Sequence, residues 1–199
     1  MKANNQNKPV SIKHQAAIDY ARSGFNVMPC RPNMKKPLTA QCHNDATTDL
    51  TRINYWFECV PKANVAIRTS NLLVLDVDVK NGVDGYKALR RLERKYEKLP
   101  TTRTQSTPSG GKHYIYKVNG LMVPSVVNIP RKGLDVRGHD GYIVAAPSKI
   151  DGKPYVMDSH EIAEAPVWLV NLIFKLAQKQ KQQSIDYHPG CGSPEDSYR

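Results

Sequence analysis

The segment Leu72–Val79 constrains the fold of this sequence most, because it is aliphatic yet contains two carboxylates. Its β-branched and aliphatic residues predict a buried strand. Side chains two positions apart share a face of a strand, about 6.6 Å apart at about 3.3 Å per residue. Asp76 and Asp78 therefore face one way together, while the aliphatic residues between and beside them face the core. Two carboxylates this close repel each other unless a cation lies between them.

Two interpretations of this pair remain open on the sequence. A hard divalent cation would remove the repulsion, and Mg²⁺ typically binds one or two carboxylates together with substrate phosphates. Alternatively, both aspartates lie on a solvated sheet face and bind nothing. A calcium-binding EF-hand loop is excluded, because Lys80 and Asn81 stand where an oxygen ligand and a glycine are required.

A third carboxylate, Asp135, lies in the segment "GLDVRG", which we predict to be another strand with Arg137 on the same face. A histidine, His113, opens a further predicted strand directly after two glycines. Asp135 is therefore a third candidate metal ligand.

The glycines Gly110 and Gly111 would let the backbone approach a phosphate closely. Lys112 and His113 would then supply positive charge or N–H donors. Taken singly, "SGG" is an ordinary hairpin turn and His113 a structural histidine, so the sequence leaves both interpretations open.

The order of predicted elements favours an α+β domain with a mixed sheet. Helices are predicted at residues 11–24, 49–60, 85–99 and 166–182, the second capped by Thr48. Units of strand, glycine turn and strand are predicted at 102–118 and 133–148. No GxGxxG or GxxxxGK[ST] motif is present, so neither a dinucleotide fold nor a P-loop is supported. We expect a disordered segment at 1–10, one domain at 11–177, and a polar linker or the start of a following region at 178–199.

The charge of the chain indicates a polyanionic partner. Lys and Arg number 29 against 18 Asp and Glu, which gives a net charge of +11. Such a surplus favours nucleic acid, although a charge that only serves solubility is the alternative. The basic face of the helix predicted at 85–99 could follow a template backbone or simply be solvated. No apolar run is long enough to span a membrane, and we expect a cytoplasmic protein.

Four cysteines are scattered without CxxC spacing. Cys30, Cys42, His43 and Cys59 could gather around zinc, but paired short spacings are missing. We therefore expect reduced thiols and no zinc.

Several segments, in this order, resemble a known family: "AIDYARSGFNVMPC", "KKPLT", "DATTDLTRINYWFECVPKANVAIRTS", "LLVLDVDVKNGVDG", "TPSGGKHYIY" and "GLDVRGHDGYIVAAPS". Together they are similar to the N-terminal bifunctional DNA primase/polymerase (prim-pol) domain of the archaeo-eukaryotic primase superfamily. The resemblance covers residues 11–175. It implies a mixed α/β unit joined to an RRM-like catalytic sheet flanked by helices.

The resemblance also implies roles for particular residues. The acidic first motif maps to Asp76 and Asp78, the second to Gly111-Lys112-His113, and the third to Leu134-Asp135. The superfamily often has serine where Gly111 stands, so a hydroxyl contact is missing here. The three aspartates would carry two Mg²⁺ or Mn²⁺ ions, and His113 would contact the phosphates of the incoming nucleotide. Additional nucleotide contacts are expected at Gly110, Gly111, Lys112, Arg137 and Lys36.

The implied activity is nucleotide addition to a primer 3′-OH on single-stranded DNA, with or without synthesis of the primer itself. The substrates would be nucleoside triphosphates, and the setting a plasmid, phage or mobile-element replication protein with a downstream helical or helicase domain outside this chain. A non-catalytic module for single-stranded nucleic acid or nucleotides is the alternative, which ten tyrosines and the charge would suit. Two metal ions would serve nuclease chemistry equally well. Nucleotide-sugar transfer explains neither "SGGKH" nor the charge.

Overall fold

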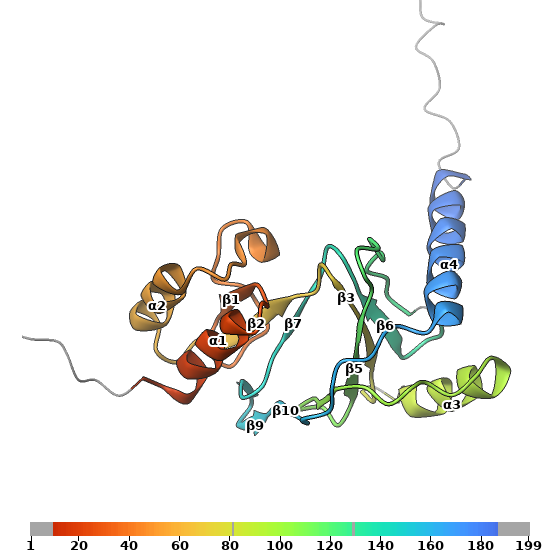
Figure 1. Cartoon of the computed structure of the whole chain (residues 1–199). Coiled ribbons are helices and arrows are strands. Elements are labelled where there is room, and N and C mark those ends of the chain that lie inside the picture. Colours follow the sequence, from red (N-terminus) through yellow and green to blue (C-terminus); the bar gives the residue numbers. More distant parts are fainter. Residues whose placement is uncertain (1–9, 81, 129, 187–199) are drawn as a thin grey trace, which may run out of the picture.

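The computed structural model describes residues 10–80, 82–128 and 130–186. The disorder expected for 1–10 and the end of the linker expected at 178–199 fall almost entirely outside these residues. The described chain forms an α+β domain with two principal antiparallel sheets and helices at opposite ends of the molecule (Figure 1). The predicted α+β class is confirmed. No helix in the described ranges is long and apolar enough to cross a membrane.

The larger sheet has five strands in the order β10-β4-β5-β3-β6, so β3 lies inside it, between β5 and β6. Every ladder between its strands is antiparallel. The strands are β3 (Leu72–Val77), β4 (Thr104–Ser106), β5 (Lys112–Lys117), β6 (Leu134–Arg137) and β10 (Val156–Met157).

The smaller sheet has the order β1-β2-β7 and is also antiparallel. A separate two-stranded ladder joins β8 and β9. The strands are β1 (Val27–Cys30), β2 (Asn64–Arg68), β7 (Tyr142–Val144), β8 (Lys149–Ile150) and β9 (Lys153–Pro154). The predicted mixed sheet is therefore wrong, because every ladder between these strands is antiparallel. In the described part of the chain, parallel pairing is limited to one isolated bridge between Lys117 and Glu164.

Helices cover the two sheets separately, α1 and α2 on the smaller sheet and α3 and α4 beside the larger one (Figure 1). They are α1 (Ile12–Arg22), α2 (Leu50–Cys59), α3 (Gly85–Lys95) and α4 (Val167–Asp186), with a short 3-10 helix η1 (Cys42–Asp45). Thr48 does not cap α2; the Asp49 side chain does, accepting from the Thr51 N–H at 2.9 Å. Helix α3 ends at Lys95, before the predicted 99. Helix α4 continues past residue 177, where we placed the end of the domain.

Strand β3 is buried on both faces, which explains its continuous aliphatic sequence. Leu73, Leu75 and Val77 belong to the core that α3 and α4 cover. Leu72 and Val74 belong to the core around α1, α2 and the smaller sheet. Asp76 shares the face of this second pair, so it lies where that core ends. The strand thus fixes the position of the carboxylate between the two halves of the domain.

The segment 133–148 does not form the predicted hairpin. Its two strands belong to different sheets, since β6 pairs with β3 and β7 pairs with β2. The chain crosses between the sheets at Gly138–Gly141, and the Thr69 hydroxyl donates to the Gly138 carbonyl at 2.6 Å. A Cβ on Gly138 would lie 2.0 Å from the Val123 carbonyl oxygen, so only glycine fits this crossing.

Candidate active site

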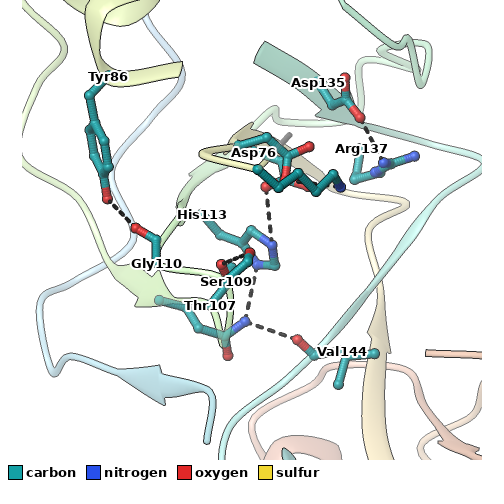
Figure 2. Close-up of polar contacts among 12 residues, drawn as sticks. Asp76, Tyr86, Thr107, Ser109, Gly110, His113, Asp135, Arg137 and Val144 are labelled. Carbon is teal, nitrogen blue, oxygen red and sulfur yellow. Dashed lines mark hydrogen bonds and ion pairs between the residues drawn. The ribbon is translucent and has the colours of Figure 1, made fainter. Parts of the chain in front are cut away.

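Three carboxylates converge at the end of β3. Asp76 is the direct cross-strand partner of Asp135 on β6. One oxygen from each of Asp76, Asp78 and Asp135 lies within 4.8 Å of the others. Figure 2 shows the carboxyl group of Asp76 facing the His113 ring and that of Asp135 paired with the Arg137 guanidinium. The structure therefore brings the three aspartates of the sequence prediction together.

Asp78 reaches this cluster from just beyond the strand, because β3 ends at Val77. Its N–H donates to the Gly133 carbonyl at 3.0 Å, and its own carbonyl accepts from the Gly85 N–H at 2.9 Å. A Cβ on Gly85 would lie 2.5 Å from both the Asp78 and the Gly133 carbonyl oxygens. The glycines of "VDG" and "KGLD" thus allow the close backbone contact that fixes Asp78.

The three carboxylates differ in their electrostatic surroundings. Burial, followed by the neighbouring Asp78 charge, raises the pKa of Asp76 to about 6. Asp135 pairs with Arg137 at 3.0 Å and accepts the Asn128 N–H at 2.8 Å. Asp78 pairs with Lys80 at 3.2 Å. Asp78 and Asp135 are thus each paired with a cation, whereas the charge of Asp76 is opposed by burial and by its acidic neighbours.

The donor set of this cluster fits a hard divalent cation. All three side chains offer carboxylate oxygens, which suit Mg²⁺ or Mn²⁺ better than a metal that prefers sulfur or imidazole. A cation placed among them would also offset the repulsion from Asp78, which adds to burial in raising the pKa of Asp76. Cys30, Cys42 and Cys59 are free thiols and do not belong to this cluster of carboxylates.

His113 lies directly opposite Asp76 on the neighbouring strand β5. Its Nε2 atom is 3.5 Å from the Asp76 Oδ1 atom. Burial, followed by the charges of Lys35 and Arg137, lowers the pKa of His113 to about 3. The ring is therefore neutral at physiological pH, and it can donate one N–H without adding charge.

A cavity of about 260 Å³ opens beside Asp76 and His113 at the junction of the two sheets. It combines two cations, Lys35 and Arg137, with the rings of Tyr142 and Tyr155. A second cavity of about 190 Å³ adjoins it and shares Lys35. The first is lined by Lys35, Asp76, His113, Ser125, Arg137, Asp140, Gly141, Tyr142, Ile143, Val144 and Tyr155.

Three of the expected nucleotide contacts, Gly110, Gly111 and Lys112, are not among the residues that line the first cavity. Lys112 pairs with Val77 and alternates with His113, so it lies on the opposite sheet face from the cavity. Gly110 has a φ of +87° and makes the turn. A Cβ on Gly111 would lie 2.2 Å from the Val77 carbonyl oxygen, so glycine is required there by strand packing.

Lys35, not the expected Lys36, lines the cavity. The Lys35 carbonyl accepts from the Tyr142 hydroxyl at 3.1 Å and from the Cys30 thiol at 3.4 Å. The Lys36 carbonyl accepts the Arg31 N–H at 2.8 Å, which closes the loop. "KKP" offers two adjacent lysines, and no local pattern distinguishes them. The cavity-lining tyrosines were also missed: Tyr155 lies outside the segments that resemble the family, and Tyr142 lies within "GYIVAAPS" but was given no role there.

Comparison of the sequence with known protein families identifies the family of this chain. Residues 17–168 match the family described as "Bifunctional DNA primase/polymerase, N-terminal". The match covers most of the chain, which therefore belongs to the Prim-Pol family, as the sequence resemblance indicated. No curated protein gives a significant match. Membership implies nucleotidyl transfer on DNA with nucleotide substrates, and a general requirement for metal.

Proposed function

We propose that this domain adds nucleotides to a primer 3′-OH on a single-stranded DNA template by metal-dependent phosphoryl transfer. The observation that carries this proposal is the convergence of Asp76, Asp78 and Asp135 beside a cavity that also holds two cations and a buried histidine. Clustered carboxylates add nothing to simple binding of phosphate, whereas two-metal transfer requires them.

The three aspartates would hold two Mg²⁺ or Mn²⁺ ions. When bound, such ions lower the pKa of an attacking hydroxyl and offset the charge of the triphosphate and its leaving group. His113 would donate its N–H to a phosphate oxygen, and Lys35 and Arg137 would neutralise further phosphate charge. Tyr142 and Tyr155 border the remaining space, where they would contact the sugar or base of the nucleotide.

The scaffold supports an RRM-like interpretation of the catalytic sheet. Strands β4, β5, β3 and β6 lie side by side in this order, and α3 connects β3 to β4. We infer a catalytic domain over 11–177, which contains the matched residues 17–168. The exposed basic side chains of α3 remain candidates for the template backbone. They are Arg90, Arg91, Arg94 and Lys95.

The cellular setting follows from the resemblance alone. We infer a cytoplasmic replication protein of a plasmid, phage or other mobile element, in which a helical or helicase domain follows this one. Primer initiation would depend on that further domain, while extension would not.

Primer extension on single-stranded DNA with labelled deoxynucleotides and Mn²⁺ tests the proposal. Asp76→Ala and Asp135→Ala should each reduce incorporation to background while circular dichroism shows an intact fold. Asp19→Ala, an exposed aspartate on α1, is the matched control and should retain full activity. Full activity in either cluster variant would contradict the assignment.

Two further incubations separate the alternatives. End-labelled DNA with metal and no nucleotides should stay intact; degradation would indicate a nuclease. Single-stranded DNA binding without template-dependent incorporation by the unmodified domain would favour the binding module. Parallel reactions with ribonucleotides, with and without primer, would define sugar preference and initiation.

A further inference from the structure

Gln105 is a fully buried amide that contacts two residues lining the first cavity, His113 and Val144. It lies on β4, directly opposite His113 on β5. Its Nε2 atom is 3.0 Å from the His113 Nδ1 atom and 2.9 Å from the Val144 carbonyl oxygen. Its Oε1 atom accepts the Ala146 N–H at 2.7 Å. All the hydrogen-bonding atoms of this amide are therefore engaged.

Two backbone groups fix which end of the amide is which. The Ala146 N–H can only donate, so the atom facing it must be the amide oxygen. The Val144 carbonyl can only accept, so the atom facing it must be the amide nitrogen. A flipped amide would lose both bonds and leave two buried backbone groups without partners, at a cost of about 1–3 kcal/mol each. The nitrogen end of Gln105 consequently faces His113.

The protonation of His113 follows from this orientation. The second N–H of the Gln105 amide points at Nδ1, so Nδ1 must be the acceptor and carry no proton. A neutral ring then has its proton on Nε2, the atom that faces Asp76 and the cavity. The opposite tautomer would turn a lone pair toward the carboxylate and place two N–H groups against each other at Nδ1.

We propose that Gln105 is a positioning residue that holds His113 as the Nε2–H tautomer, so that its single N–H, on the side of Asp76 and the cavity, can donate to the phosphates of the bound nucleotide. The tautomer follows from the geometry alone. The phosphate contact rests on the proposed function. The Val144 bond also ties β4 to β7, and a purely structural role for Gln105 would consist of this link between the sheets.

Long-range ¹H–¹⁵N correlation spectra of the histidine rings in the metal-free protein distinguish these roles. His113→Asn identifies the His113 signals among the six histidines. In the unmodified protein, His113 should show a protonated Nε2 and an unprotonated Nδ1. The opposite pattern would overturn the proposal without any Gln105 variant.

Gln105→Glu places a carboxylate oxygen opposite Nδ1, so the Nδ1 signal should become that of a protonated nitrogen. Gln105→Met keeps the approximate shape and removes the bond, so the two tautomers should mix. If Gln105→Glu fails to fold, Gln105→Met and the unmodified protein still decide the question. An unchanged His113 spectrum in a folded variant would contradict the proposal.

Ser148→Ala is the control for a structural effect. The buried Ser148 hydroxyl donates to the Val65 carbonyl and accepts the Val65 N–H, so its loss should lower stability without altering the His113 spectrum. Gln105→Met should also weaken nucleotide binding about twofold for an even mixture of tautomers, because only the Nε2–H form can donate to the phosphate. Unchanged nucleotide affinity together with a changed tautomer would refute the phosphate contact. The expected spectra in an unmodified protein that lacks primer extension would refute the proposed function and leave the tautomer assignment intact.

Discussion

Asp76 and Asp135 are direct cross-strand partners on β3 and β6, and both carboxylates are largely buried. Like charges placed directly opposite each other on a sheet are destabilising. Asp135 is paired with Arg137, whereas Asp76 is left with a raised pKa. The site thus contains a repulsion between carboxylates, which lowers the stability of the metal-free fold and favours a bound cation.

Replacing Asp76 with asparagine should stabilise the metal-free domain. The neutral amide removes the buried charge, so we expect a gain of about 1–2 kcal/mol, or roughly 2–6 °C in melting temperature. The same variant should lose the stabilisation that Mn²⁺ gives the unmodified protein. Calorimetry of both proteins with and without Mn²⁺ measures these changes, with Asp19→Asn as control. A lower melting temperature for Asp76→Asn would contradict the repulsion.

Metal binding should strengthen as pH rises through about 6. The pKa of Asp76 is raised in the folded state from an ordinary value of 3.8 to about 6. Ionised Asp76 therefore destabilises the metal-free fold increasingly between these two values, by up to about 3 kcal/mol above pH 6. Below pH 6 a cation must displace a proton from this carboxyl group. The melting-temperature increase caused by Mn²⁺ should be larger at pH 7.5 than at pH 5, and most of this difference should vanish in Asp76→Asn.

Alanine at position 111 should destabilise the domain far more than alanine at another turn glycine. At Gly111 the new Cβ would meet the Val77 carbonyl oxygen, so β3 and β5 would have to separate, at about 3 kcal/mol or more. At Gly120 the φ is +80° with no atom nearby, and only backbone strain of about 1 kcal/mol opposes alanine. Urea unfolding compares the two, and equal losses would argue against the close contact.

Lys35 and Lys36 should differ in their effect on nucleotide binding. Lys35 lines both cavities, the first of which is also lined by Asp76, whereas Lys36 lines neither. Lys35→Ala should raise KM for the nucleotide about tenfold through the loss of one charged contact. Lys36→Ala should leave KM nearly unchanged. Steady-state primer extension measures both, and the reverse ranking would restore the role expected for Lys36.

The cysteines should differ sharply in reactivity. Burial, with a contribution from nearby Cys42, raises the pKa of the Cys30 thiol to about 12, while Cys59 is exposed at the end of α2. Because the thiolate is the reactive form, iodoacetamide at pH 8 should label Cys59 and spare Cys30 in the folded protein. Peptide mapping by mass spectrometry gives the extent at each site. Denatured protein, in which Cys30 should react, is the control.

Local patterns in the sequence were sufficient to predict several helices and strand pairings of the fold. The sequence predicted a helix over 11–24, which contains α1, and the glycine turn before His113 predicted the pairing of β4 with β5. Side-chain alternation placed Arg137 beside Asp135, and the structure confirms that pair at 3.0 Å. Each of these features depends on residues within a few positions of one another, where spacing alone determines direction.

Other features depend on contacts between distant segments. The predicted hairpin at 133–148 is wrong because Thr69 and Val123 hold the crossing at Gly138 and send the two strands to different sheets. Lys112 belongs to the motif but lies on the far sheet face, and no local signal favoured Lys35 over Lys36. Gln105 belongs to no motif, and its partners come from β5, from β7 and from the chain just after β7.

The sequence by itself determined that acidic side chains interrupt a buried strand, because the alternation of side chains along a strand is a local property. Only the tertiary structure decided that Asp135 and His113 lie opposite Asp76, because strand order and register depend on how the two cores pack around β3. The same packing leaves the cavity at the junction of the sheets, where Lys35, Arg137 and the tyrosines meet the carboxylates.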